Sequence, residues 1–194
     1  MMARVSRPVM KRRKVIVNIG TSADGFIARP GGDLEWLTSR PAPRGFYGMG
    51  AFVKSIDTKV LGRKTYEASL RLGAKFEPPT RYIVFSRETR PADAPLGVEF
   101  VSEAIGPFVS RLREQPGKDI WLMGGGGLIA SFLDEGAIDE LVITVAPVFI
   151  GDGIPLIARR HRHVPLELLS VQQFENGVVQ LHYRVQSGAP SVPR

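Results

Sequence analysis

The chain has 194 residues, of which 43% are hydrophobic and 23% charged, as is typical of one globular domain of ordinary size. It contains no cysteine, which excludes disulfides, thiolate metal sites and cysteine nucleophiles, and no apolar run approaches the roughly 18 residues that span a bilayer. The net charge of +7 is concentrated at the N-terminus, so the rest of the chain lacks the basic stripe of a nucleic-acid platform and we expect no nucleic-acid partner.

The first predicted segment is a basic arm at residues 1–13. Four arginines and two lysines fall within residues 1–14 without a single acid, and no apolar core of a secretory signal accompanies them. We therefore expect a disordered or extended arm in a cytoplasmic protein, a single domain at residues 14–186, and a C-terminal tail at residues 187–194.

The elements that follow alternate between strands and helices. Residues 14–21 (KVIVNIGT) are rich in β-branched residues and predict a strand, which leads into a turn-rich loop with Asp33 as the cap of a short helical turn. Helices are predicted over 46–56, 62–73 and 107–114, and short strands over 59–61, 82–86 and 98–101.

A tract of four glycines, Gly124 to Gly127, separates a predicted strand at residues 120–123 from an amphipathic helix that Gly136 closes. Backbone without side chains at the start of a helix presents unpaired N–H groups and the positive end of the helix dipole, which is an anion site in any fold. Close packing of helix and strand explains one or two such glycines, and four in a row favour the approach of a ligand.

The C-terminal third is rich in strands. Residues 140–150 form a β-rich run, and Asn176-Gly177 between residues 166–174 and 178–185 predicts a hairpin. The whole pattern predicts a three-layer α/β/α domain with a mixed, mostly parallel sheet of about eight strands and an antiparallel C-terminal hairpin at one edge.

Two further strand ends carry groups that bind anions. Arg63, Lys64 and Thr65 follow one strand and its Gly62, and Ser86 with Arg87 ends another. Together with the glycine tract they fit a ligand with several phosphates, such as NADPH. His161 and His163 have no acid near them in the sequence, so we expect a basic surface loop there and no metal site.

The motifs ADGFIA, LGRKTYE, IVFSR and IWLMGGGGLIASFL, in this order, resemble the dihydrofolate-reductase-like superfamily. The tract IDELVITVAPVFIGDGIPLI is most similar to the C-terminal reductase domain of the bacterial bifunctional riboflavin biosynthesis protein and its stand-alone relatives. The resemblance implies NADPH as cofactor, with the phosphates at Arg63, Lys64 and Thr65 and the 2′-phosphate at Ser86 and Arg87. The full implied cofactor set is Gly20, Ile27, Gly62, Arg63, Lys64, Thr65, Ser86, Arg87, Gly124, Gly125, Gly126, Gly127 and Leu128.

Within that set, the glycine tract and the N–H of Leu128 would cradle the pyrophosphate, and Gly20 with Ile27 would lie against the nicotinamide. Asp24 matches an acidic position beside the active-site loop, and Asp33 is the second candidate acid. Trp36 either stacks on a planar substrate or anchors its helix in the core.

These residues predict an NADPH-dependent reductase of a pterin-like or aminopyrimidine-type heterocycle, similar to the 5-amino-6-(5-phosphoribosylamino)uracil reductase of riboflavin biosynthesis. A catalytically inactive nucleotide-binding protein and a protein that binds partners through its basic arm are the alternatives. The resemblance also implies a homodimer paired through the C-terminal strands.

Overall fold

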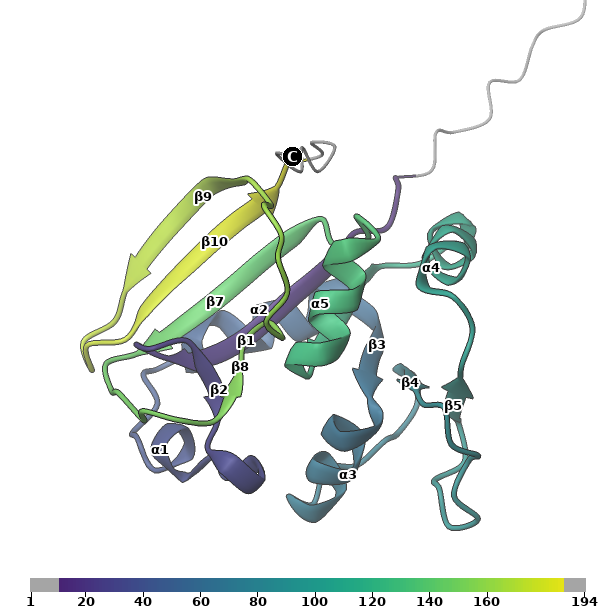
Figure 1. Cartoon of the computed structure of the whole chain (residues 1–194), viewed down its shortest axis with the longest axis horizontal. Coiled ribbons are helices and arrows are strands. Elements are labelled where there is room, and N and C mark those ends of the chain that lie inside the picture. The colour runs from purple at the N-terminus through teal and green to yellow at the C-terminus, as the bar shows by residue number, and fades with distance from the viewer. Residues whose placement is uncertain (1–10, 187–194) are drawn as a thin grey trace, which may run out of the picture.

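A computed structural model of the chain describes residues 11–186. Its centre is an eight-stranded sheet in the order β5-β4-β3-β6-β1-β7-β10-β9 (Figure 1). The strands are β1 (Val15–Ser22), β3 (Ile56–Gly62), β4 (Arg81–Phe85), β5 (Val98–Val101), β6 (Asp119–Gly124), β7 (Glu140–Ala146), β9 (Leu166–Gln173) and β10 (Val179–Val185). The first six strands of that order run parallel, and β10 pairs antiparallel with both β7 and β9. The predicted mixed sheet with an antiparallel hairpin at one edge is confirmed.

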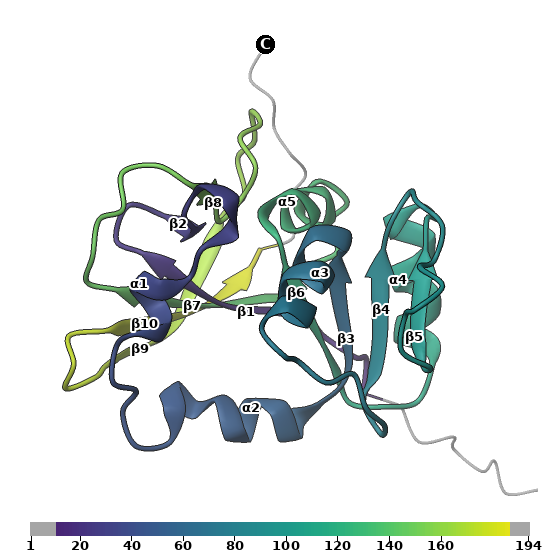
Figure 2. The ribbon, with the colours of Figure 1, turned by 90° about the horizontal axis from the view of Figure 1, so that it is seen from below.

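Helices cover both faces of the sheet, as a parallel sheet requires. The helices are α1 (Glu35–Thr38), α2 (Met49–Ser55), α3 (Arg63–Arg71), α4 (Ile105–Glu114) and α5 (Gly126–Asp134). Figure 2 shows α2 and α5 on opposite sides of β1. The main core lies under α4 and α5, and a second cluster around Tyr66 of α3 lies on the other face.

Alternation along the strands assigns each side chain to one of these faces. In β6, Ile120 and Leu122 are fully buried in the core under α4 and α5. Trp121, between them, points to the opposite face, where the ring of Phe52 from α2 meets it edge-on at a centroid distance of 5.3 Å. The predicted helix over residues 46–56 is therefore present, as a 3-10 turn (Phe46–Gly48) followed by α2.

Two small elements escaped prediction. Phe26–Ala28 (β2) and Ile154–Pro155 (β8) form a separate two-stranded sheet that joins segments more than a hundred residues apart. Strands of three and two residues are too short to show a period in the sequence, so only tertiary pairing defines them.

The N-terminal boundary needs one correction. Arg13, which the sequence places in the arm, retains 4% of its exposure and is part of the domain. Its guanidinium donates to the carbonyl of Lys118 at 2.6 Å and to Thr58 Oγ1 at 2.7 Å, and it pairs with Asp57. A buried arginine is tolerated because these acceptors replace water. The rest of the predicted arm up to residue 10, and the predicted tail at residues 187–194, lie outside the described residues.

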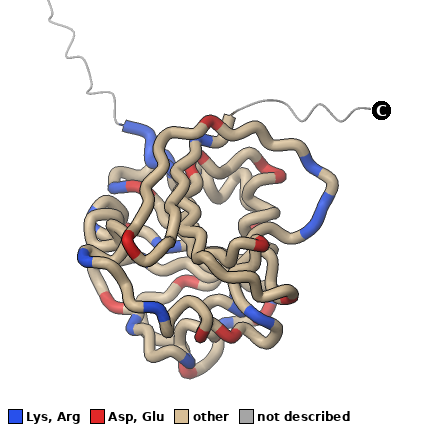
Figure 3. The backbone as a smooth tube through the Cα atoms, turned by 90° about the vertical axis from the view of Figure 1, so that its left-hand side faces the viewer, with Lys and Arg blue, Asp and Glu red and all other residues tan. Residues whose placement is uncertain are grey.

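Charges are mixed over the described part of the chain. In the view of Figure 3, basic and acidic positions are both scattered along the tube of residues 11–186, with long uncharged stretches between them. Within these residues no helix is long and apolar enough to cross a membrane, and no cluster of three or more metal-binding side chains occurs.

Candidate cofactor and substrate site

The sheet opens between β1 and β6 at its carboxyl edge. Pairing of these strands stops after Val17 and Leu122, whereas β1 stays paired with β7 as far as Ser22. On its other side, β6 slips in register against β3 just before Gly124. The two strands therefore separate where the glycine tract begins, and the carboxyl ends of parallel strands at such a point are where ligands bind in open α/β sheets.

The four glycines of the tract have different reasons to lack a side chain. Gly124 has a φ of +103°, which strongly favours glycine, and its peptide bond to Gly125 is cis. Gly126 is buried against the backbone of Pro155 and Leu156, and a Cβ there would lie 3.1 Å from the Leu156 oxygen and nearer still to that of Pro155. A Cβ at Gly127 would meet nothing within 4 Å. Packing thus accounts for Gly126, while Gly127 leaves open backbone.

The glycine tract meets two of the other predicted motifs. A Cβ at Gly125 would lie 3.4 Å from Thr65 Oγ1 and 3.8 Å from Ile27 Cδ1. A Cβ at Gly62 would lie 3.7 Å from the Gly124 oxygen. The ends of β3 and β6, together with Ile27 of β2, therefore converge at the carboxyl edge of the sheet.

The start of α5 supplies the free N–H groups of this edge. The first N–H groups of a helix have no acceptor within the helix, and in α5 these belong to Gly126 and Gly127. The N–H of Leu128, which the sequence adds to the anion site, instead donates to the Gly125 carbonyl at 3.0 Å. The donors available to an anion are thus the N–H groups of Gly126 and Gly127, because the Leu128 N–H already forms a hydrogen bond within the protein.

Arg63 is engaged within the protein. Its Nε donates to Glu67 at 2.5 Å, its Nη1 donates to the Thr89 carbonyl at 3.3 Å, and Glu88 lies 3.7 Å from its Nη2. The hydrogen bond to Glu67 raises the pKa of the guanidinium. Arg63 therefore ties the start of α3 to the loop after β4.

The remaining cations of this edge are free of such contacts. Lys64 and Arg87 are exposed, and neither forms a hydrogen bond or ion pair with any of residues 11–186. Ser86 closes a local turn by accepting a hydrogen bond from the N–H of Glu88 at 3.0 Å. Lys64 and Arg87 are thus the cations at this edge that remain available to an anionic ligand.

Asp24 clamps a distant loop. Its carboxylate accepts hydrogen bonds from the N–H groups of Gly151 at 2.8 Å and Ile150 at 3.1 Å, and from the Ser22 hydroxyl at 2.5 Å. The hydrogen bond from Ser22, aided by the two N–H groups, lowers the pKa of Asp24. This carboxyl is ionised at neutral pH and holds no proton to donate.

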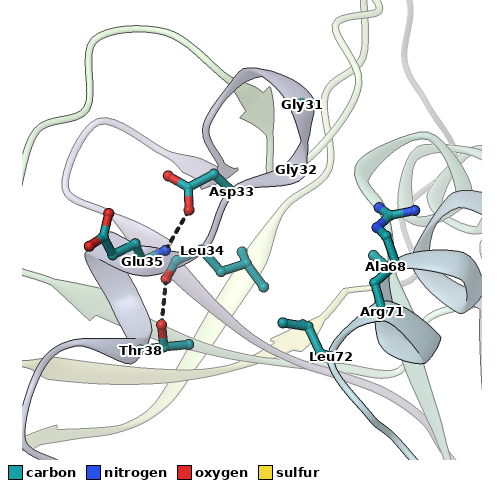
Figure 4. A pocket seen from close by; sticks show the side chains of 9 residues that line it. All are labelled: Gly31, Gly32, Asp33, Leu34, Glu35, Thr38, Ala68, Arg71 and Leu72. Atoms are coloured by element: carbon teal, nitrogen blue, oxygen red, sulfur yellow. Dashed lines mark hydrogen bonds between the residues drawn. The ribbon is translucent and has the colours of Figure 1, made fainter.

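Asp33 lines a cleft of about 350 Å³ between the turn before α1 and the C-terminal half of α3 (Figure 4). Opposite it lie Ala68 and Arg71 of α3 and Leu72, which follows the helix. Asp33 accepts from the N–H of Glu35 at 2.9 Å and from Arg29 at 3.0 Å, and the Glu35 bond is the main cause of its lowered pKa. The N-cap position of α1 is occupied by Leu34, so the predicted cap at Asp33 stands one residue before that position, although it still accepts the N–H of Glu35.

Two neighbouring residues of α1 differ in their surroundings. Trp36 retains 5% of its exposure and its indole Nε1 has no acceptor among the described residues, so most of the ring belongs to the core. Leu37, which the sequence did not single out, covers Gly20, and a Cβ on Gly20 would lie 3.0 Å from Leu37 Cδ2. The small residue at position 20 therefore makes room for the side chain of Leu37 in this structure.

Polar residues on the same face as Gly20 were also missed. Thr144 lies opposite Gly20 in the register of β1 and β7, and its hydroxyl accepts from Gln180 Nε2 at 2.9 Å. Asn18, two residues before Gly20, retains 7% of its exposure, and its carbonyl accepts the Trp121 indole N–H at 3.1 Å. An asparagine inside the apolar run KVIVNIGT was the available signal.

Known proteins resemble this chain over most of its length. The profile of the RibD C-terminal domain matches residues 13–180. The uncharacterised protein YwjB of Bacillus subtilis (strain 168) is 37% identical over 173 residues, which cover 88% of this chain and 97% of YwjB. A crystal structure from Shewanella sp. PV-4, named for riboflavin biosynthesis, is 28% identical with a TM-score of 0.81, covering 89% of this chain and 99% of that one.

A more distant structure shares the fold. The diaminohydroxyphosphoribosylaminopyrimidine deaminase/5-amino-6-(5-phosphoribosylamino)uracil reductase of Thermotoga maritima is 19% identical with a TM-score of 0.69. The match covers 90% of this chain and 57% of that longer one.

Proposed function

The chain belongs to the RibD C-terminal domain family, and on that premise we propose that it is an NADPH-dependent reductase of a planar, polar nitrogen heterocycle of pterin or aminopyrimidine type. The observation that carries the proposal is the convergence of Gly125, Thr65 and Ile27 at the carboxyl edge of the sheet, where the pairing of β1 with β6 ends. The Thermotoga maritima relative, named as a uracil reductase, supports the class of substrate. We place the reaction in the cytoplasm, as expected from the sequence.

The residues present fit a phosphorylated dinucleotide. The open backbone at Gly127 and the free N–H groups at the start of α5 would hold the pyrophosphate. Lys64 and Thr65 would meet the same phosphates from the start of α3, and Ser86 with Arg87 would take the 2′-phosphate. Arg63 would act indirectly, because its hydrogen bonds to Glu67 and Thr89 hold the two cation-bearing segments together.

NADPH, when bound, supplies a hydride to a C=N or C=O group of the substrate. The nitrogen or oxygen left behind needs a proton, and the protein must orient its source. Asp24 and Asp33 remain the candidate acids, but hydrogen bonds lower the pKa of both carboxyls, so each would be ionised at neutral pH. We therefore propose that they orient a water molecule that delivers the proton.

Titration with NADPH tests the cofactor. The chain has two tryptophans, and Trp121 lies in β6 three residues before the glycine tract, so NADPH should quench tryptophan fluorescence and raise the melting temperature. Oxidation of NADPH in the presence of a panel of pterins and aminopyrimidines then tests the chemistry. Binding of NADPH without turnover by any member of the panel would favour the inactive nucleotide-binding alternative, and no binding would reject both.

We also propose that the protein is a homodimer paired through β9 and β10. Leu166, Leu168 and Val171 of β9 are 41%, 52% and 55% exposed. On the face that carries α5, no helix of the described residues lies over these two strands (Figure 1). An exposed apolar sheet face of this kind favours association. Light scattering at micromolar concentration should give a dimer, and Val171→Glu should give a monomer with unchanged secondary structure; a monomeric wild type contradicts the proposal.

A further inference from the structure

Glu88 follows the two residues to which the proposed function assigns the 2′-phosphate, Ser86 and Arg87. The Ser86 hydroxyl donates to the Glu88 carbonyl at 3.1 Å, and its oxygen accepts the N–H of Glu88 at 3.0 Å. A hydroxyl has one proton to donate, so Ser86 must give up its bond to the Glu88 carbonyl when it donates to a phosphate. The backbone of Glu88 therefore already occupies one of the donors that a 2′-phosphate needs.

The side chain of Glu88 reaches from this loop to Arg63 at the start of α3. One carboxylate oxygen lies 3.7 Å from Arg63 Nη2, which is longer than a hydrogen bond, and the side chain retains 75% of its exposure. An exposed ion pair of this kind is weak, because water screens both charges. The carboxylate can therefore leave Arg63 at little cost in free energy.

Arg63 does not depend on Glu88 for its position. Its Nε donates to Glu67 at 2.5 Å, and its Nη1 donates to the Thr89 carbonyl at 3.3 Å. The central carbon of its guanidinium lies 5.8 Å from the centre of the Phe100 ring. Removal of the Glu88 carboxylate leaves these three contacts in place, so its contribution at this edge is a negative charge rather than support for Arg63.

We propose that Glu88 is a specificity-determining residue that competes with the 2′-phosphate of the cofactor. In the free protein its carboxylate supplies the negative charge beside Arg63. When NADPH binds, the phosphate at Ser86 and Arg87 displaces this carboxylate into solvent, whereas NADH leaves it in place. The inference rests on the proposed function for the location of the 2′-phosphate, and it adds a residue whose effect on binding is opposite in sign to that of Arg87.

Coulomb's law gives the size of the effect. Two unit charges about 6 Å apart in water change an affinity about threefold, and a phosphate with nearly two charges changes it about tenfold. Glu88→Gln removes the charge and keeps the size of the side chain, so it should tighten NADPH binding by about threefold to tenfold. The affinity for NADH should change by less than about twofold, because NADH lacks the 2′-phosphate. Added salt should reduce the gain, since it screens exposed charges.

Isothermal titration of the cofactor-free protein with matched nucleotides tests the competition. NADPH and NADH report on the whole cofactor, while adenosine 2′,5′-bisphosphate and adenosine 5′-monophosphate report on the 2′-phosphate without any reaction. Glu88→Gln should raise the affinity for NADPH and the bisphosphate and leave the other two nearly unchanged. Glu167→Gln is the matched control, because Glu167 is also exposed and paired with an arginine, Arg184, at 2.7 Å on the opposite edge of the sheet. It should change none of the four affinities.

The outcomes separate this inference from its premise. A Glu88→Gln protein that binds NADPH no more tightly than the wild type, or that gains equally for NADPH and NADH, would overturn the role of Glu88 and leave the proposed cofactor in place. A wild type that binds neither NADPH nor NADH would reject the proposed function and this inference with it. Because the Glu88 side chain is exposed, the variant should keep the wild-type melting temperature, so that its affinities report on binding alone.

Discussion

Gly126 and Gly127 should respond oppositely to replacement by alanine, although they are neighbours in the first turn of α5. Neither has a positive φ, so alanine is compatible with the backbone at both positions. At Gly127 the new methyl meets nothing within 4 Å, and alanine should stabilise the helix by up to about 1 kcal/mol. At Gly126 it meets the backbone oxygens of Pro155 and Leu156, which cannot rotate away, and overpacking of this kind costs ~1–3 kcal/mol.

The same pair separates packing from ligand binding. Urea unfolding should show a lower midpoint for Gly126→Ala and an equal or higher midpoint for Gly127→Ala. If the pyrophosphate approaches the backbone at Gly127, the methyl there should weaken NADPH binding about tenfold or more, the value of one hydrogen bond to a charged group. A Gly126→Ala protein as stable as the wild type would refute the packing reasoning. A Gly127→Ala protein that binds NADPH normally would refute the ligand reasoning.

Further outcomes follow from single residues. Arg87→Ala should weaken NADPH by ~1.5–3 kcal/mol in parallel titrations and leave NADH nearly unchanged; equal losses for both would exclude Arg87 as the reader of the 2′-phosphate. Arg13→Met should lower the free energy of unfolding by about 2–3 kcal/mol, because it removes the cation paired with Asp57 and the donor to two backbone carbonyls; urea unfolding checks this, and a change below about 0.5 kcal/mol contradicts it. Burial alone would raise the pKa of Glu140, but hydrogen bonds from Lys14 and His182 outweigh it and hold the pKa below its ordinary value of 4.5. The ionised carboxylate thus contributes stability above pH 4.5, and this stability is lost as the pH falls through the folded pKa. The free energy of unfolding of Glu140→Gln should therefore fall less than that of the wild type between pH 5 and pH 3, and parallel curves of this free energy against pH would refute the reasoning.

Local pattern was sufficient wherever an element carries its own signals. The Asn176-Gly177 pair predicts the β9–β10 hairpin, and in the structure Gly177 takes the left-handed position of the turn, with a φ of +80°, which glycine favours. The end of α5 is equally local. Gly136 has a φ of +59°, and its N–H donates to the Leu133 carbonyl. The N–H of Ala137 donates to the Phe132 carbonyl, as expected of a helix that ends at a glycine.

Contacts between distant segments could not be read in the same way. Asp24 stands in a turn that looks self-contained, yet its acceptors are filled by N–H groups of residues 150 and 151. Arg63 is two residues from Thr65 in a motif rich in phosphate-binding groups, yet Glu67 and the loop after β4 engage it. A sequence shows which groups can bind an anion, but the competition between an external anion and an internal acid is decided by what the fold brings within hydrogen-bonding distance.

The sequence by itself determined the fold class, the order of the elements and the strand ends that carry the glycine tract and the cations, because periodicity and turn chemistry act over a few residues. The tertiary structure decided that Gly126 serves packing while Gly127 leaves open backbone, and that Leu37 covers Gly20. These outcomes depend on the separation of β1 from β6 and on the approach of residues 155–156 to α5. Both are set by long-range packing, which no local pattern of residues encodes.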